Sequence, residues 1–184
     1  MAGSESQTDR LFLAVPLTDE VRNKLVAELP PLPGRSVPPG NWHFTLRFLG
    51  NTNAQQRDAL TSALRKTRLG PPFSICFSGL GAFPRPKRAR IIWLGVDEGA
   101  KELALLAETV ESAVRRAGFP PEERPFKAHL TISRVEPGQP VAEVLAAQRP
   151  LAVRMPVREV CLVRSQLGGG PARYEVLHRF PLAV

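Results

Sequence analysis

Sulfur, histidine and long apolar runs are scarce in this sequence. Its 184 residues include two cysteines and three histidines. Cys76 and Cys161 each stand alone in an apolar segment, which favours buried, reduced thiols over a disulfide framework or a cysteine zinc site. The longest early apolar run, residues 11–17, is followed by Thr18 and then by two acidic residues. It is far shorter than the ~20 residues of a membrane span and has the wrong flanks for a signal peptide. We therefore expect a cytoplasmic protein that neither is secreted nor inserts into a membrane.

Motifs of several hydrolase classes are also missing. The chain has no HExxH pair, as in zinc peptidases, and no G-x-S-x-G elbow, as in serine hydrolases. No cysteine and no pair of carboxylates stands beside His43 or His129 in the sequence. The sequence therefore predicts neither a bound metal nor a cofactor.

Acidic residues are absent from three long windows of a chain whose net charge is +8. The windows are residues 29–57, 82–96 and 124–135. Their basic residues are Arg35, Arg47 and Arg57 in the first, Arg85, Lys87, Arg88 and Arg90 in the second, and Arg124, Lys127 and Arg134 in the third. Such windows favour an anionic partner such as RNA, DNA or a phosphorylated small molecule. Chance clustering in a basic chain is the alternative explanation.

Short strands and helices are predicted in an irregular order. Residues 1–9 are small and polar and are expected to form a loose terminus, and the Pro/Gly-rich stretch 30–41 is expected to be a connection. Apolar periodicity and turn residues place strands at 10–17, 42–50, 73–83, 89–96, 126–135, 151–167 and 172–182, and helices at 19–29, 54–68, 100–117 and 140–148. Because the elements do not alternate regularly, the sequence predicts an α+β fold in one domain over residues 1–184.

The first two helices have clear starting signals. Thr18 and Asn53 are the predicted N-caps, since their side-chain oxygens can accept hydrogen bonds from the first turn of a helix. The 3.6-residue period predicts the buried face of the first helix from four positions: Val21, Leu25, Val26 and Leu29.

A short pattern occurs twice, 86 residues apart. Residues 43–46 read His-Phe-Thr-Leu and residues 129–132 read His-Leu-Thr-Ile, each within a predicted strand. Side chains at i and i+2 of a strand point to the same side. Each strand therefore presents one imidazole and one hydroxyl on one face and two apolar side chains on the other. The repeat predicts a duplicated, two-lobed architecture with a cleft that receives both pairs.

The two pairs suit an in-line displacement at a phosphodiester. One histidine can take a proton from the attacking oxygen and the other can give one to the leaving oxygen, since an imidazole pKa of about 6.5 lies near neutrality. The hydroxyls of Thr45 and Thr131 can donate hydrogen bonds to phosphate oxygens, and Arg134 can add positive charge. A single histidine on a half-apolar strand is more often structural, and the repeat is what favours catalysis. His178 has no threonine partner and is interpreted as structural or surface.

Both His-x-Thr-x motifs resemble the signature pair of the 2H phosphoesterase superfamily. Five segments resemble one branch of it, the RNA 2′,3′-cyclic phosphodiesterases, also called 2′-5′ RNA ligases or the LigT family: RLFLAVPL, HFTLRFLG, GLGAFPRPKRARIIWLGV, RPFKAHLTISRV and RYEVLHRFPL. The resemblance covers nearly the whole chain. It implies a bilobal, pseudo-symmetric fold in which antiparallel sheets line a basic central cleft and helices lie outside.

The same resemblance implies a reaction. We expect a monomer that hydrolyses 2′,3′-cyclic phosphate ends of RNA to 2′-phosphates without a metal. Two alternatives stay open. The same site could join a cyclic phosphate end to a 5′-hydroxyl end, such as those of tRNA halves, through a 2′-5′ linkage. The protein could also be a non-catalytic RNA-binding module whose histidines only contact phosphates.

The resemblance also implies roles for the motif residues. His43 is expected to be the general acid that protonates the leaving 3′-oxygen, and His129 the general base that activates water. The near two-fold symmetry leaves the reverse assignment open. Thr45, Thr131 and Arg134 are expected to hold the phosphate oxygens. Three aromatic residues are candidates either for base stacking or for the core: Phe12, Phe48 and Phe83.

Overall fold

Most of the β-strands form where β-branched and aromatic residues recur between turn residues. The computed structural model describes residues 8–149 and 151–183, so most of the loose terminus expected at 1–9 lies outside the described residues. The strands are β1 (Asp9–Pro16), β2 (Arg35–Ser36), β3 (His43–Thr52), β4 (Phe73–Phe83), β5 (Ala89–Val96), β6 (Leu130–Gln139), β7 (Arg154–Val157), β8 (Glu159–Gln166) and β9 (Arg173–Pro181). The helices are α1 (Asp19–Glu28), α2 (Ala54–Arg65), α3 (Ala100–Arg116) and α4 (Ala142–Ala147), with 3-10 turns η1 (Pro39–Asn41) and η2 (Pro86–Arg88).

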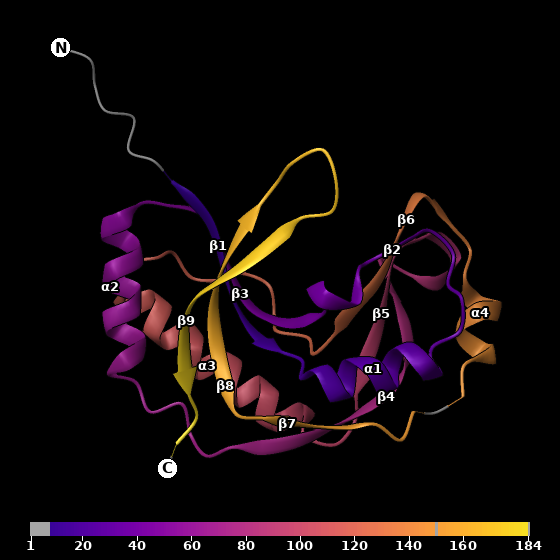
Figure 1. Cartoon of the computed structure of the whole chain (residues 1–184), viewed down its shortest axis with the longest axis horizontal. Coiled ribbons are helices and arrows are strands. Elements are labelled where there is room, and N and C mark those ends of the chain that lie inside the picture. Colours follow the sequence, from indigo (N-terminus) through magenta and orange to yellow (C-terminus); the bar gives the residue numbers. More distant parts are fainter. Residues whose placement is uncertain (1–7, 150, 184) are drawn as a thin grey trace.

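The described strands pair antiparallel in the order β7-β4-β5-β6-β3-β1-β8-β9, with β2 added to β6. β3 and β6 meet at a single residue pair, Phe44 and Leu130. The sheet therefore has two arms, which Figure 1 shows on either side of this junction. The first arm contains β1, β3, β8 and β9, and the second arm contains β2, β4, β5, β6 and β7. The predicted α+β class and two-lobed antiparallel arrangement are confirmed.

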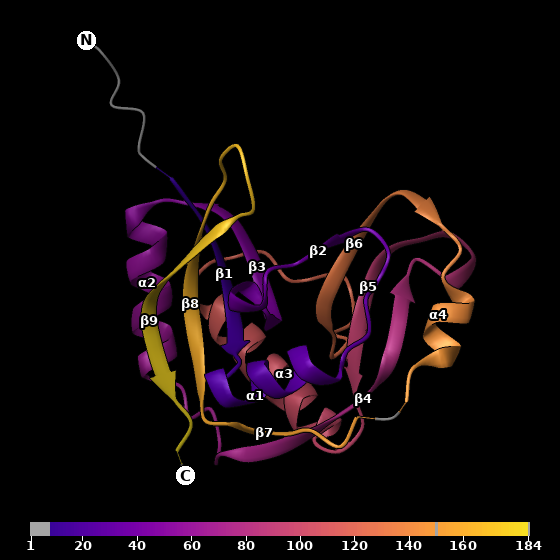
Figure 2. The same cartoon turned by 45° about the vertical axis from the view of Figure 1, so that its right-hand side comes forward.

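The larger helices lie beside the arms. α2 and α3 pack against each other, with α2 next to β9 and α3 next to β3 of the first arm. α4 lies at the outer side of the second arm in both views (Figures 1 and 2). No helix in the described ranges is both long enough and apolar enough to span a membrane.

One hydrophobic core spans both arms. Phe44 of β3 and Phe77 of β4 are almost fully buried, and their rings stack with centroids 5.8 Å apart. Leu130, which pairs with Phe44, is also fully buried. Because neighbours along a strand point to opposite faces, the residues that flank Phe44 and Leu130 lie on the side away from this core.

The starts of the first two helices follow the prediction. The Thr18 hydroxyl accepts a hydrogen bond from the Val21 N–H, and Asn53 forms a capping box with Gln56. Val26, predicted on the buried face of α1, is instead 51% exposed. α1 has only ten residues and buries one i, i+4 pair, Val21 and Leu25, so its apolar stripe is narrower than the predicted one.

Two segments differ from the predicted elements. Residues 151–167, predicted as one strand, form β7 on the second arm and β8 on the first. Both halves are apolar and largely buried, so the composition does not mark the crossing at Arg158. Residues 30–41, predicted as a connection, contain β2. The Val37 N–H donates to the Ile132 carbonyl and fixes this short strand on β6.

Candidate active site

The two His-x-Thr pairs lie side by side at the junction of the arms. The antiparallel register of the buried junction pair places His43 next to Thr131, and Thr45 next to His129. The two imidazoles therefore lie on one diagonal of this group and the two threonines on the other. Each imidazole has the threonine of its own motif beside it along the strand and the threonine of the other motif beside it on the neighbouring strand. The fold brings together two pairs that the sequence separates by 86 residues.

Both ring nitrogens of His43 have polar partners. Nδ1–H donates to the Asn41 carbonyl at 2.7 Å, and Nε2 lies 3.0 Å from the Thr45 hydroxyl. Because a carbonyl can only accept, Nδ1 carries the proton of the neutral ring and Nε2 accepts from Thr45. The ring also packs on Phe12, with centroids 4.8 Å apart, and edge-to-face on Tyr174 at 5.3 Å. Nε2 is thus the atom that can exchange a proton with a substrate.

The pKa of His43 is lowered from its ordinary value of 6.5. Burial is the largest cause, because the charged ring loses water. The hydrogen bond to the Asn41 carbonyl opposes this effect and raises the pKa, while the positive charges of His129 and Arg134 lower it further. His43 is therefore neutral in the ligand-free protein near pH 7, and both of these cationic groups lie within electrostatic reach of it.

His129 lies immediately before β6, which begins at Leu130 and not at residue 126 as predicted. Its Nδ1–H donates to the Lys127 carbonyl at 2.7 Å, as His43 does to the residue two positions before it. Its ring lies edge-to-face on Phe83 and Trp93, with centroids 5.2 and 6.4 Å away. The two histidines therefore have the same tautomer, with Nε2 as the nitrogen available to a substrate.

Lys127 adds a positive charge beside His129. Its Nζ lies 4.6 Å from the ring centre of Trp93 and 5.0 Å from that of Phe83. Such cation–π contacts hold the ammonium group against the rings. Arg134, on β6 and exposed, lies three residues beyond Thr131. The histidines, the threonines and two cations thus gather around one place on the sheet.

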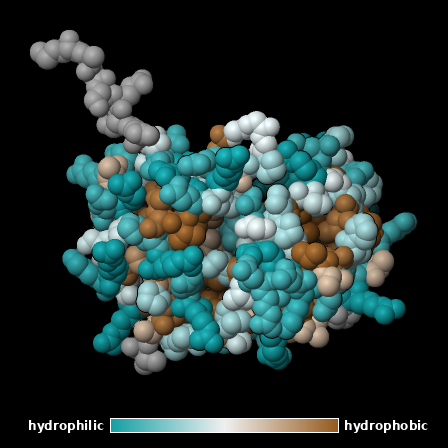
Figure 3. Space-filling view, viewed as in Figure 1, coloured by the Kyte–Doolittle hydropathy of each residue, from teal (hydrophilic) through white to brown (hydrophobic). Residues whose placement is uncertain are grey.

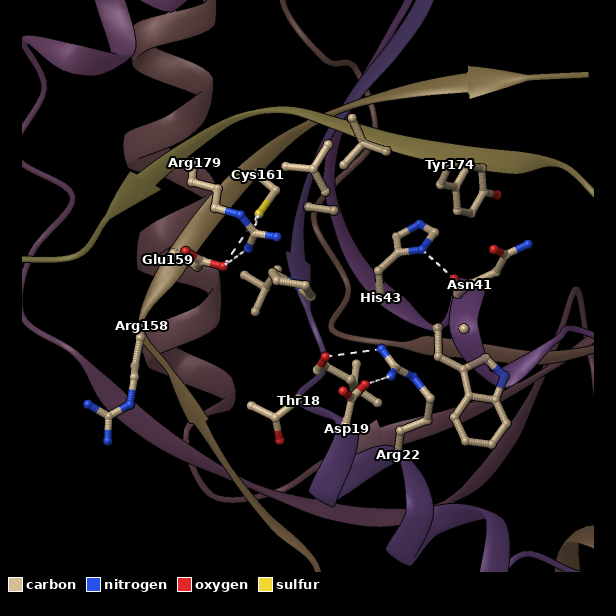
Figure 4. Close-up of a pocket in the computed structure, with 18 of the residues that line it drawn as sticks. Thr18, Asp19, Arg22, Asn41, His43, Arg158, Glu159, Cys161, Tyr174 and Arg179 are labelled. Atoms are coloured by element: carbon tan, nitrogen blue, oxygen red, sulfur yellow. Dashed lines mark hydrogen bonds and ion pairs between the residues drawn. The ribbon is translucent and has the colours of Figure 1, made fainter.

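A pocket of about 620 Å³ opens beside His43. Side chains of β1, β8, β9, η1 and the start of α1 line it, and Figure 4 shows His43 next to Tyr174 and Asn41 in it. Two ion pairs also line it: Arg22–Asp19 and Arg179–Glu159. The surface of the molecule carries hydrophobic patches over both arms in the view of Figure 3. The volume suits a ligand the size of a nucleoside.

The cysteines and the third histidine lie apart from these pairs. Cys161 lines the far part of the pocket, and burial raises the pKa of its thiol to about 12, so the thiol stays protonated. Both cysteines are free thiols. His178 lies on β9 and lines a shallow hollow with residues of α2. Within residues 8–149 and 151–183, no three or more His, Cys, Asp or Glu side chains group as metal ligands would.

Three residues around the histidines were not predicted. Asn41 acts through its carbonyl, which every residue type has, so no sequence signal marks it. Tyr174 comes from the last strand, 131 residues after His43. Trp93 has a weak signal in Gly81, where a Cβ would overlap its ring. Of the three stacking candidates, Phe12 contacts His43, Phe83 contacts His129, and Phe48 packs on Phe12 while 55% exposed.

Comparisons with known proteins give one consistent family. The profile of the 2′-5′ RNA ligase superfamily matches residues 11–169. The RNA 2′,3′-cyclic phosphodiesterase of Archaeoglobus fulgidus is 38% identical over 141 residues, which cover 74% of this chain and 78% of the relative. The enzyme of the same name from Escherichia coli is 31% identical over 182 residues, covering 96% and 98%.

Solved structures agree with the sequence relatives. A crystal structure described as a phosphoesterase superposes with a TM-score of 0.82 and 30% identity, covering 97% of this chain and all of that one. The structure of E. coli LigT complexed with 3′-AMP superposes with a TM-score of 0.80 and 29% identity, with the same coverage.

Proposed function

Because the chain belongs to the 2′-5′ RNA ligase superfamily, we propose that it is a phosphodiesterase that hydrolyses 2′,3′-cyclic phosphate ends of RNA to 2′-phosphates. Relatives that align with most of the chain are named after this activity. The observation that carries the proposal is the diagonal placement of the two His-x-Thr pairs at the β3–β6 junction. No step of the proposed reaction requires a metal.

In the proposed reaction, His43 is the general acid and His129 is the general base. Nε2 of His129 takes a proton from water as its oxygen bonds to phosphorus. The bond from phosphorus to the 3′-oxygen breaks on the opposite side, and Nε2–H of His43 donates its proton to that oxygen. Each such proton transfer contributes on the order of 10²- to 10⁴-fold.

The pocket beside His43 supports this direction. Both oxygens of a cyclic phosphate belong to one ribose, so the ribose lies on the side of the leaving oxygen. The pocket, which is large enough for a nucleoside, adjoins His43 and is lined by Tyr174 and Phe12. A nucleoside seated there carries its 3′-oxygen toward His43 and leaves the His129 side open to water.

His43 must take up a proton from solvent when the phosphate binds, before it can act as an acid. The pKa of His43 is lowered in the ligand-free protein, and a phosphate anion next to Nε2 favours the imidazolium. Thr45, which donates to Nε2 of the neutral ring, then turns its hydroxyl to a phosphate oxygen. Thr131 and Arg134 hold the other non-bridging oxygens and stabilise the charge that develops there.

Hydrolysis of a short RNA with a 2′,3′-cyclic end, in the presence of EDTA, tests the proposal. The product should be a 2′-phosphate, and His43→Ala or His129→Ala should each lower kcat by at least about 10²-fold. Activity that needs an added metal ion, or that survives both substitutions, would contradict the mechanism. Binding of RNA without turnover would instead support the RNA-binding module. We also propose that the protein is a monomer and that it acts on RNA in the cytosol. Sedimentation should then give the mass of one chain.

Ligation is a second candidate because the matched superfamily is named for it. A 5′-hydroxyl placed where water attacks would bond to phosphorus as the 3′-oxygen leaves, and would form a 2′-5′ linkage with the same two histidines as base and acid. Incubation with a cyclic phosphate end and a 5′-hydroxyl end should then give a joined product that resists a 3′-5′-specific nuclease. Absence of any joined product confines the protein to hydrolysis.

A further inference from the structure

The cations of the two arms differ in their partners. Around the first arm, four arginines pair with carboxylates: Arg47 with Glu111 and Glu122, Arg57 with Asp9, Arg164 with Asp9 and Glu175, and Arg179 with Glu159. Three exposed arginines of this arm, Arg10, Arg158 and Arg173, form no ion pair with a described residue and lie on β1, directly before β8 and on β9. At the edge of the second arm lie six exposed cations that form no ion pair with any described residue: Arg35, Arg85, Lys87, Arg88, Arg90 and Arg134. We call these six residues the basic edge.

Two members of the basic edge face each other across strands. Arg35 of β2 is the register partner of Arg134 of β6. Directly opposed residues of an antiparallel pair project to the same face, and like charges there destabilise the pairing. An anion bound between the two guanidinium groups removes this repulsion. Arg134 is the member nearer to the His-x-Thr pairs and holds the reacting phosphate in the proposed reaction, so Arg35 is left for the next phosphate of the chain.

The backbone holds Arg35 in this position. The Ser133 hydroxyl, fully buried on β6, donates to the Pro33 carbonyl at 2.7 Å. Gly34 has a φ of +89°, and a Cβ there would overlap the β6 backbone, so only glycine allows this close approach. Arg35 thus projects from a fixed strand and not from a loose connection, which lowers the entropy lost when it binds an anion.

The basic edge continues beyond this pair. Gly138, near the end of β6, lies against the side-chain stems of Arg88 and Arg90, whose Cγ atoms are 3.5 and 3.3 Å from its Cβ position. The Val141 N–H donates to the Pro86 carbonyl at 2.9 Å and ties η2 to the start of α4. From Thr131 to Gly138 the strand advances roughly 20 Å, at about 3.3 Å per residue. That length exceeds one nucleotide and suits a chain of phosphates.

We propose that the basic edge binds the RNA chain that precedes the cyclic end, with Arg35 as its first phosphate contact beyond the catalytic site. This inference rests on the proposed function, because it assumes that the terminal nucleotide lies at the His-x-Thr pairs. The substrate is then single-stranded RNA of several nucleotides, held through its phosphates along the second arm. The first arm, where four arginines are paired with carboxylates, receives only the terminal nucleoside in its pocket.

Substrates of two lengths test the proposal: a 2′,3′-cyclic mononucleotide and a ten-nucleotide RNA with the same cyclic end. Arg35→Ala should raise KM for the long RNA about threefold to tenfold, with little change for the mononucleotide. The slope of log(kcat/KM) against log salt should become shallower by about 0.7 for the long RNA, the value for one lost contact to a single strand. Arg35→Lys keeps the charge and should restore most of the loss.

A matched triple variant controls for general charge. Arg85→Ala/Lys87→Ala/Arg88→Ala should make the slope shallower by about 2, whereas Arg65→Ala/Lys66→Ala/Arg68→Ala, which removes the same charge at the end of α2, should not. Equal losses in the two triple variants, or equal effects of Arg35→Ala on both substrates, would overturn the proposal. Anisotropy of the long RNA bound to the His43→Ala/His129→Ala protein tests the basic edge even if no hydrolysis occurs.

Discussion

At the level of single residues, the two histidines share a tautomer and differ in their surroundings. Each donates Nδ1–H to the carbonyl two positions earlier. His43 has Phe12, Tyr174 and a hydroxyl around it, while Lys127 stands near His129. The pKa of His43 is lowered by burial and by nearby positive charge. A phosphate anion bound beside the ring should therefore raise this pKa and favour the imidazolium.

Removal of one of those charges should be visible in the titration of His43. In Arg134→Ala the pKa of His43 should rise, because a positive charge that disfavours the imidazolium is gone. Addition of inorganic phosphate to the wild-type protein should raise it as well. NMR titration of the imidazole C–H signals measures both shifts. A pKa of His43 above 6.5 in the wild-type protein would contradict the electrostatic description. So would a pKa of His43 that changes in the control Arg65→Ala but not in Arg134→Ala.

The sequence was sufficient for the residues that carry a chemical pattern. The repeated His-x-Thr spacing predicted which four side chains share one site, because a strand's two-residue period fixes their common face. Residue types alone could not predict a partner that acts through its backbone carbonyl, such as Asn41. Nor could they predict Tyr174, which reaches His43 only because β9 pairs with β8 and β8 with β1.

At the level of elements, most strands and helices followed from local chemistry, and the exceptions have tertiary causes. The helix caps and the strands at 73–83 and 89–96 were predicted where the structure has them. β2 was missed because proline and glycine surround it, and its two residues become a strand only through β6. The division between β7 and β8 was missed because each half finds its partners on a different arm.

The contact between β2 and β6 can be tested with two glycines. Gly34→Ala should lower the free energy of unfolding by more than Gly118→Ala does. Both glycines have positive φ, near +90°, and the strain of alanine there is about 1 kcal/mol or somewhat more. Only at Gly34 would the new methyl group also overlap the β6 backbone; at Gly118 it meets open space. Urea denaturation of both variants gives the difference.

Gly34→Ala should also affect the proposed RNA contact. Because β2 must move away from β6 to accommodate the methyl group, Arg35 loses its register opposite Arg134. The variant should therefore raise KM for the ten-nucleotide substrate, as Arg35→Ala does, while Gly118→Ala should not. Equal stabilities of the two glycine variants would show that the segment is not held against β6 as described.

At the level of the whole molecule, one core joins the two arms although their strands pair at a single position. Phe44 and Phe77 stack across the junction. The apolar side of the junction therefore holds the two arms together, and the His-x-Thr pairs lie on its polar side. Because both arms share this core, we expect the protein to unfold in one cooperative transition.

Two phenylalanines on β3 test whether the apolar side of the junction stabilises the protein. Phe44→Ala should lower the free energy of unfolding by about 3–5 kcal/mol, the usual cost of truncating a fully buried phenylalanine. Phe48→Ala, at a residue 55% exposed, should cost much less. Urea denaturation followed by far-UV circular dichroism and by tryptophan fluorescence should give coincident curves. Two separate transitions in the wild-type protein would show that the arms are independent.

The diagonal of histidines and threonines about the Phe44–Leu130 pair is close to two-fold symmetric, and a phosphate is nearly symmetric too. In the proposed reaction, direction is therefore not encoded by the four motif residues, which would serve a substrate turned end for end equally well. We propose that it is encoded by what surrounds them: a nucleoside-sized pocket on one side and the basic edge on the other. A protein engineer who wished to invert the polarity of this enzyme would rebuild those flanks and leave all four motif residues untouched.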